Sequence, residues 1–204
     1  MNSIASHSVS TDETTEELVR GRLLSHYASS YGERAADHVA SMLRLAHVEE
    51  RYHYLRSVIG PARALLRGPI LISGFGAGSE LLVARQFGFP DVLGVEVDPF
   101  LVEIARQRLQ HVAGIRVDLY DGVTVPCPDQ SLAVVISGHI IEHTADPATY
   151  LRECFRLLMP GGYLFLEFPT RFHWRELHTG LPSLEWFPAS LRKFMNCGQC
   201  LTAS

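Results

Sequence analysis

A glycine-rich segment is the first part of the sequence that could bind a ligand. Gly74, Gly76 and Gly78 follow the short apolar run of residues 70–72 and precede a helix-like stretch. Glycine permits unusual backbone angles and lets a ligand approach the main chain closely. A strand, a glycine turn and a helix in succession direct backbone N–H groups and a helix N-terminus to one place. The segment therefore predicts a site for a nucleotide-like or adenosyl ligand.

The spacing of these glycines bears on which ligand the loop binds. The dinucleotide fingerprint G-x-G-x-x-G would need glycine at position 79, where the sequence has Ser79. The observed G-x-G-x-G, with Phe75 inside it, matches pyrophosphate binding poorly. Gly78 is expected to let the following helix pack closely against its strand. A tight strand-to-helix turn without a ligand is the alternative interpretation.

Two carboxylates follow the next strand-like segments. Glu96 lies at the end of an apolar run, 22 residues after Gly74, where a carboxylate can accept both hydroxyls of a ribose. Asp121, with Gly122, comes just after a third apolar segment, and its carboxylate could accept an adenine amino group. Asp-Gly is also a favoured turn pair, so a turn residue is an equally good interpretation of Asp121.

Two further aspartates have a structural explanation. Asp98 precedes Pro99, and Asp146 precedes Pro147. An aspartate at the N-cap followed by proline at the first helical position is a typical helix start. We therefore expect both aspartates to cap helices.

Two histidines are candidates for acid–base chemistry. His139 and His143 lie four residues apart after the apolar run 132–136, and histidine can accept a proton near neutral pH. His139 is the better placed as a base, although a non-catalytic role is the alternative for both. Three more residues could join them around a metal: His173, Glu176 and His178. Their spacing is not that of a zinc motif, so we expect no metal site.

Strands alternating with helices must position these residues. Apolar strand-like runs cover residues 70–72, 92–97, 115–119, 132–136 and 163–168, and helix-like stretches cover residues 80–87, 100–109 and 147–158. This alternation predicts an α/β fold with a parallel sheet that has helices on both faces. The connection over residues 120–131 contains two prolines and is expected to be a loop.

The part before residue 65 has a different pattern. Apolar residues recur at helical spacing up to Gly60, and Thr14 with Glu17 has the spacing of a capping box. We expect a helical N-terminal segment over residues 1–65, with about the first 12 residues disordered, and a ligand-binding domain over residues 66–204.

Composition excludes several classes of protein. The net charge is −4, so nothing attracts the chain generally to nucleic acid. No apolar run approaches the roughly 20 residues that span a bilayer. The four cysteines form no disulfide framework, and the pair at Cys197 and Cys200 has no second pair to complete a metal site. A cytoplasmic location is the resulting expectation.

The order of these features resembles the class I S-adenosylmethionine (SAM) dependent methyltransferases, especially the small-molecule group called methyltransferase type 11. Five blocks carry the resemblance: residues 70–78 (ILISGFGAG), 94–98 (GVEVD), 121–131 (DGVTVPCPDQS), 140–143 (IIEH) and 156–162 (RLLMPGG). Each block is common alone, but their joint order is specific. The resemblance implies a Rossmann-like fold, SAM as cofactor and methyl transfer to a small-molecule acceptor.

The resemblance also assigns residues. Glu96 would bind the ribose, Asp121 and Gly122 would lie by the adenine, and residues 137–139 would face the methionine and the acceptor. The cofactor-binding set is then Ser73, Gly74, Phe75, Gly76, Gly78, Glu96, Val97, Asp121, Gly122 and Ser137. A SAM-binding or regulatory protein without turnover, or a NAD-linked oxidoreductase, remain the alternatives.

The remaining predictions concern the C-terminal and N-terminal parts of the chain. The family implies seven strands, but only 35 residues follow Pro169 and they contain no convincing hairpin, so we expect the C-terminal β-hairpin to be absent or the chain truncated. An exposed sheet edge would then favour a homodimer. Residues 168–178 are an expected acceptor wall, and Tyr27 or Tyr31 is expected to reach toward the cofactor.

Overall fold

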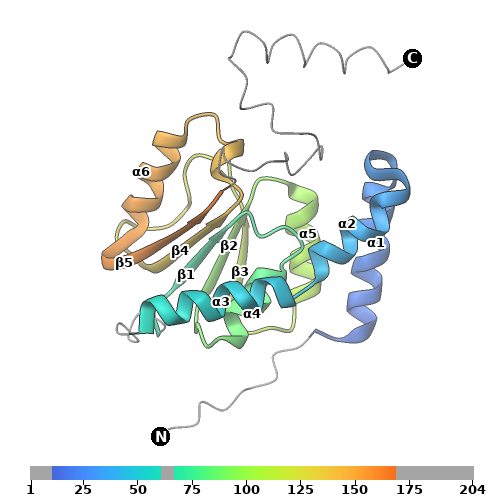
Figure 1. Cartoon of the computed structure of the whole chain (residues 1–204), viewed down its shortest axis with the longest axis horizontal. Helices are drawn as coiled ribbons and strands as arrows, with labels where there is room; N and C mark the ends of the chain where they lie inside the picture. The colour runs from blue at the N-terminus through green and yellow to red at the C-terminus, as the bar shows by residue number, and fades with distance from the viewer. Residues whose placement is uncertain (1–10, 61–66, 169–204) are drawn as a thin grey trace, which may run out of the picture. The chain divides into compact units, whose positions relative to one another are not determined.

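The computed structural model describes residues 11–60 and 67–168, and the elements up to Glu167 form one compact unit. Its five strands form a single parallel sheet in the order β3-β2-β1-β4-β5 (Figure 1). The strands are β1 (Ile70–Ser73), β2 (Val92–Glu96), β3 (Ile115–Leu119), β4 (Leu132–Gly138) and β5 (Leu158–Glu167). The helices are α1 (Glu13–Tyr31), η1 (Gly32–Arg34), α2 (Ala35–Leu43), α3 (Ala46–Ile59), α4 (Ser79–Gln86), α5 (Pro99–Leu109), η3 (Ile141–His143) and α6 (Pro147–Leu157).

Alternate residues of the central strands enter two separate cores. Ile70 and Ile72 of β1 pack in a core with α3, α4 and α5, whereas Leu71 packs on the opposite face with α6. Successive side chains of a strand point to opposite faces, so a strand buried on both faces is apolar throughout. This arrangement confirms the predicted parallel sheet with helices on both faces.

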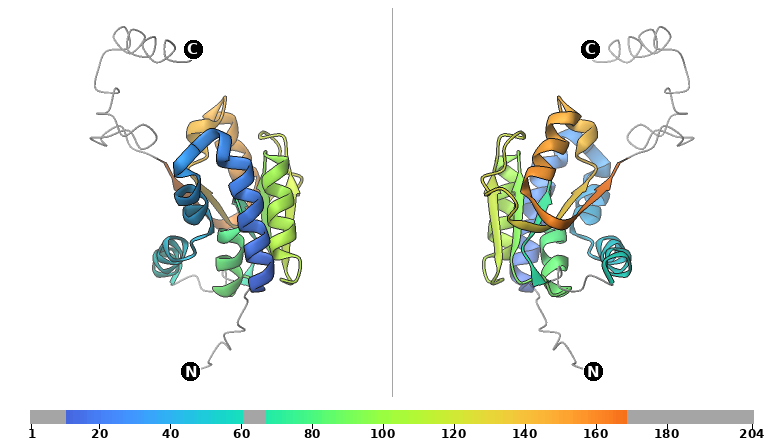
Figure 2. Two further views of the ribbon diagram at one scale, coloured as in Figure 1. Left: turned by 90° about the vertical axis from the view of Figure 1, so that its right-hand side faces the viewer. Right: turned by 90° about the vertical axis from the view of Figure 1, so that its left-hand side faces the viewer.

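The N-terminal helices extend the first of these layers. Figure 2 shows α1 lying beside α5, and Val19 and Leu23 of α1 are buried in a cluster that includes Ile104 of α5. α1 begins after Asp12, whose carboxylate accepts hydrogen bonds from the N–H groups of Thr14 and Thr15. The predicted capping box at Thr14 was therefore wrong by two residues, because the aspartate carboxylate is the stronger cap at this end.

The helix starts at the two Asp-Pro pairs were predicted correctly. Asp98 accepts a hydrogen bond from the Phe100 N–H at 2.8 Å, and Asp146 accepts one from the Ala148 N–H at 3.0 Å. Proline occupies the first helical position in both helices. These caps fix where α5 and α6 begin, directly beyond the carboxyl ends of the strands.

The last described strand, β5, is longer than predicted: a strand was expected over residues 163–168, but β5 starts at Leu158. β5 begins at Leu158, which is paired with Leu132, but the next pair is Tyr163 with Val134. The extra residues, including Gly161 at φ +81°, form a bulge where a separate turn was expected. The rest of the seven-stranded expectation, including the hairpin, lies outside the described residues, and a homodimer stays a prediction.

The connection between β3 and β4 contains no helix, as predicted, and Arg156 of α6 holds it. The Arg156 guanidinium donates to the carbonyl oxygens of Cys127 at 2.9 Å and Val125 at 3.2 Å. It also pairs with Glu153 at 2.7 Å, and Glu153 in turn accepts from the Val125 N–H. Charge-assisted hydrogen bonds thus satisfy backbone groups that a helix would otherwise satisfy.

No helix within the described ranges has both the length and the apolar character needed to traverse a bilayer.

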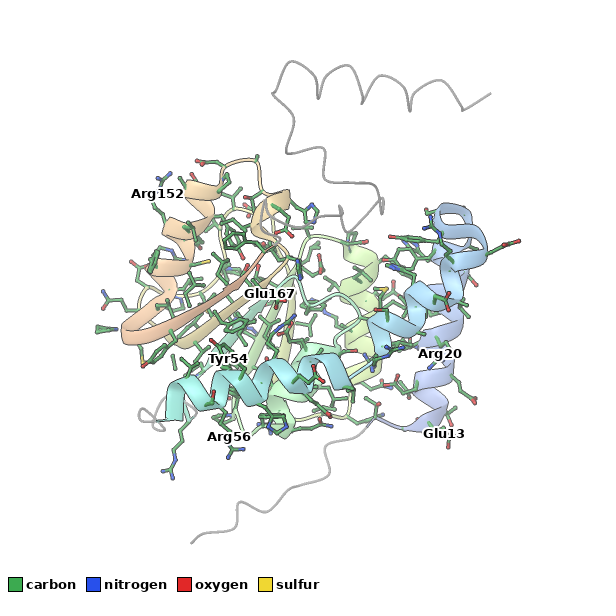
Figure 3. All side chains as sticks on the ribbon, in the orientation of Figure 1. Glu13, Arg20, Tyr54, Arg56, Arg152 and Glu167 are labelled. Atoms are coloured by element: carbon green, nitrogen blue, oxygen red, sulfur yellow. The ribbon has the colours of Figure 1, made fainter. Side chains whose placement is uncertain are left out.

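We predict that Arg156→Ala lowers the free energy of unfolding by about 1–3 kcal/mol, because two backbone carbonyls and the carboxylates of Glu153 and Asp129 lose a charged partner. Urea denaturation followed by circular dichroism measures the change. Arg152→Ala is the matched control: Arg152 lies on the same helix, projects from its outer side (Figure 3) and is 70% exposed. Its loss should cost less than about 0.5 kcal/mol, and equal costs for the two variants would contradict the role given to Arg156.

Candidate functional site

A cavity of about 550 Å³ opens at the carboxyl ends of the strands. Binding sites for small molecules usually have volumes of roughly 300–1,000 Å³, and in open α/β sheets they lie at this edge. Its lining comprises Gly74, Glu96, Val97, Tyr120, Asp121, Gly122, Val123, Ile140, His143, Thr144, Ala145, Asp146, Thr149 and Tyr150. Five of the ten residues predicted to bind the cofactor therefore lie in its wall: Gly74, Glu96, Val97, Asp121 and Gly122.

Backbone geometry explains the glycines of the loop. Gly74, Gly76 and Gly78 all have positive φ angles, between +55° and +85°. A Cβ at Gly74 would also lie 2.0 Å from Cδ1 of Ile140, so a larger residue is excluded there. A Cβ at Gly78 would lie 3.0 Å from Leu109 and 3.3 Å from Ala105, so the absence of a side chain there lets the loop pack closely against α5.

Phe75 points away from the cavity. Its side chain is 4% exposed and lies in the apolar core beside α4. A Cβ on Gly94 of β2 would come within 2.6 Å of the Phe75 ring. Phe75 thus anchors the loop in the core, and Gly94 leaves the space for it.

Glu96 joins the loop to the neighbouring strand. Its carboxylate is nearly buried and accepts hydrogen bonds from the Gly76 N–H at 3.2 Å and the Val97 N–H at 2.8 Å. A third, from the Asp98 N–H, is long at 3.4 Å. A carboxylate has about four lone-pair sites, so the two oxygens can still accept from a ligand hydroxyl.

Asp121 is a turn residue, which was one of the two interpretations that the sequence left open, and its adenine contact stays a prediction. Its carboxylate accepts from the N–H groups of Val123 and Thr124, each at 2.8 Å, which makes it a turn residue. These hydrogen bonds lower the pKa of Asp121 below its ordinary value. The residue nevertheless lines the cavity, so the turn presents a charged oxygen acceptor to whatever binds there.

Four hydroxyl groups lie together beneath the loop. Ser73 and Ser137 are register partners on β1 and β4, and both are buried. The hydroxyl of Tyr150 donates to Ser137 at 2.7 Å, and that of Tyr120 lies 3.4 Å from Ser73. Burial raises the pKa of both tyrosines, so they stay neutral. Neither serine lines the cavity itself. Ser73 and Ser137 instead provide hydrogen-bond partners for the two tyrosine hydroxyls.

The two histidines occupy different places. His143 lines the cavity, whereas His139 lies outside its lining at the end of β4, in a backbone conformation with φ +56°. The ring nitrogens of His139 lie 3.4 Å from an oxygen of Glu142 and 3.5 Å from an oxygen of Glu167. Its side chain is about half exposed, so another molecule can reach the ring.

A chain of charges links His139 to the N-terminal helices. Arg51 of α3 contacts Glu167 at 2.9 Å and Glu80 of α4 at 2.8 Å. Burial raises the pKa of Glu80 despite the opposing charge of Arg51. The Arg51 guanidinium also lies over Gly138, where a Cβ would be 3.4 Å away. Glu167, labelled in Figure 3 at the end of β5, is therefore held between Arg51 and His139.

Other expectations concern residues away from the cavity. Tyr27 and Tyr31 do not line it but pack against His38, and burial together with nearby Asp98 raises the pKa of Tyr27. Within residues 11–60 and 67–168, no three or more His, Cys, Asp or Glu side chains are arranged to hold a metal. The expected acceptor wall beyond Phe168, the remaining histidines and the C-terminal cysteine pair lie outside the described residues.

Sequence reasoning missed the two tyrosines of the site. Tyr120 directly precedes Asp121, and Tyr150 shares the buried face of α6 with Cys154 and Leu157. A tyrosine on an otherwise apolar helix face signals a buried hydroxyl that needs a partner. Only the fold shows that the partner is Ser137.

Comparisons with known proteins agree with this geometry. A family model described as "Methyltransferase domain" matches residues 71–166. A "Probable S-adenosylmethionine-dependent methyltransferase" of Mycolicibacterium smegmatis is 35% identical over 122 residues, which cover 52% of this chain and 44% of that protein. A "Ubiquinone biosynthesis O-methyltransferase" of Caulobacter vibrioides is 32% identical over 143 residues, covering 66% and 54%. The chain thus spans about half the length of these curated relatives, 44% and 54%.

A solved structure supports the fold. The crystal structure of a SAM dependent methyltransferase from Aquifex aeolicus has a TM-score of 0.50 and 19% identity, covering 67% of this chain and 73% of that one.

We predict that Gly94→Ala destabilises the protein by about 1–3 kcal/mol, because the added methyl group overlaps Phe75 and Leu81. Chemical denaturation gives the free energy of unfolding. Gly21→Ala, in the middle of α1 with no atom near the added methyl group, should instead be neutral or stabilise by up to about 1 kcal/mol. A Gly94→Ala protein as stable as wild type would disprove the tight contact between strand and loop.

Proposed function

Residues 71–166 form a methyltransferase domain of the class I SAM-dependent family, and from this premise we propose that the chain transfers a methyl group from SAM to a small-molecule acceptor. The observation that carries the proposal is the cavity at the carboxyl ends of β1, β2 and β3. Its wall unites the glycine loop with Glu96 and Asp121, which are the residue types that an adenosyl ligand requires.

The donor set of the cavity fits SAM. Glu96 would accept from the ribose hydroxyls in place of its long contact with the Asp98 N–H, and Asp121 would accept from the adenine amine. The neutral hydroxyls of Tyr120 and Tyr150 would form the wall next to Gly74. When bound, SAM supplies a methyl group activated by the sulfonium. The protein's part is then to align the acceptor and exclude water.

An acceptor that carries a proton on its nucleophilic atom, such as a hydroxyl, must also lose that proton. His139 is the proposed base: its Nδ1, which faces Glu142, would take the proton. Glu167 is the proposed positioning residue, because one of its oxygens would accept from the Nε2–H of His139 while Arg51 holds the other. His143 lines the cofactor cavity, so we assign it to binding. The O-methyltransferase of Caulobacter vibrioides supports testing hydroxylated acceptors first.

We predict that calorimetry detects binding of SAM and S-adenosylhomocysteine (SAH) to the chain, and that Glu96→Ala weakens SAM binding by at least about 1 kcal/mol. The reason is the loss of charge-assisted hydrogen bonds to the ribose. Asp91→Ala serves as a control, since this carboxylate belongs to an exposed loop at the opposite ends of the strands. NAD binding without any response to SAM would overturn the proposed function, and unchanged SAM affinity in folded Glu96→Ala would overturn the ribose assignment.

The base assignment has a separate test. We predict that His139→Ala lowers kcat about a hundredfold or more with a hydroxylated acceptor, while SAH affinity stays unchanged. His143→Ala should show the reverse pattern, with weaker SAH binding. Release of SAH across a panel of hydroxylated small molecules measures turnover. Full turnover in His139→Ala would refute the assignment, and SAM binding without turnover on any acceptor class would favour a binding protein.

A further inference from the structure

A buried arginine contacts the end of the glycine loop. Arg108 lies on α5 and is 4% exposed. Its Nη1 donates to the carbonyl oxygen of Ala77 at 3.0 Å and to the hydroxyl of Ser79 at 2.8 Å. Ala77 belongs to the loop, and Ser79 is the first residue of α4. The guanidinium therefore bridges the point at which the loop becomes a helix.

The same arginine reaches the N-terminal helices. Its Nε donates to Glu16 of α1 at 2.6 Å, and Ser79 in turn donates to the carbonyl of Met42 at the end of α2 at 2.7 Å. Thr11 also donates to the Glu16 carboxylate. One polar cluster thus joins α1, α2, α5 and the loop, although Glu16 and Arg108 lie 92 positions apart in the sequence.

The buried position of Arg108 depends on its ion pair with Glu16. A buried guanidinium needs a counter-charge and hydrogen-bond acceptors, and within the described residues Glu16 is the carboxylate that pairs with Arg108. If α1 moved away, Arg108 would be left with neutral acceptors. It would then turn toward water and release Ala77 and Ser79, because burying an unpaired charge is unfavourable.

We propose that Arg108 is a positioning residue for the cofactor loop, and that through Glu16 it makes cofactor affinity depend on the docking of α1. The proposal rests on the proposed function, since it takes SAM as the ligand of the loop. Arg108 acts on the loop backbone between Ala77 and Ser79, while Glu96 acts at Gly76. The loop is thus held at two points, and the N-terminal segment supports one of them through Glu16.

Calorimetric titration of the full chain with SAH tests the proposal. Arg108→Met should raise the dissociation constant for SAH by about tenfold or more, because charged hydrogen bonds to the loop are lost. Arg108→Lys should recover part of the affinity, and Glu16→Gln should lie between wild type and Arg108→Met. The double variant should bind no more weakly than Arg108→Met alone, since Glu16 acts through Arg108. The KM for an acceptor should stay unchanged in all of them.

Arg106→Met is the matched control. Arg106 lies on the same helix and donates twice to the carbonyl of Val117 on β3, away from the loop. Its SAH affinity should equal that of wild type. If Arg108→Met fails to fold, Arg108→Lys and Glu16→Gln carry the test. Wild-type affinity in those folded variants, or equal losses in the Arg106 and Arg108 variants, would overturn the proposal.

Amide hydrogen exchange separates this proposal from the proposed function. If wild type binds neither SAM nor SAH, the proposed function fails, but the loop can still be examined without a ligand. Faster exchange over residues 76–79 in Arg108→Met and Glu16→Gln than in Arg106→Met would support the role of Arg108 as a clamp on the loop. Equal exchange rates would overturn that role.

Discussion

Ser73 and Ser137 are partners on the neighbouring strands β1 and β4, and beyond the ends of these strands the chain turns to opposite faces of the sheet. β1 continues through the glycine loop into α4 on one face, whereas β4 continues through η3 into α6 on the other. Two connections that diverge cannot fill the space between them, so a crevice opens there. The cavity, the hydroxyl cluster and both candidate histidines all follow from this divergence.

The loop at the crevice is specified more by its surroundings than by its own residues. Its glycines supply backbone conformations but no side-chain contacts. Phe75 fixes the loop in the core, and Glu96 accepts the Gly76 N–H from the neighbouring strand. Arg108 holds the far end through Ala77. A loop fixed at three points keeps its N–H groups oriented before a ligand arrives, which reduces the ordering cost of binding.

Sequence patterns predicted the parts that depend on local chemistry. The Asp-Pro pairs marked two helix starts, because capping involves only the next few residues. Apolar runs marked β1, β2 and β4 most clearly, because strands buried on both faces have little choice of residue. Half of the predicted cofactor residues line the cavity. They lie at or just after the carboxyl ends of strands, and the cavity opens at that edge of the sheet. The start of β5 was misplaced because the pairing of Leu158 with Leu132 involves a distant strand.

The surroundings of His139 depend on contacts that no local pattern encodes. His139 was recognisable from its position after β4, but its partners come from β5 and, through Glu167, from Arg51 on α3. Arg51 in turn is held by Glu80 on the helix that follows the glycine loop. The helix-like N-terminal pattern predicted helices and gave no sign that one of them supplies a charge to the site. Since Arg51 and Glu16 both come from that segment, it bears on both sides of the crevice: α3 orients the carboxylate beside His139, and α1 supports the loop that precedes Glu80. A change in how these helices pack would therefore affect His139 and the glycine loop together.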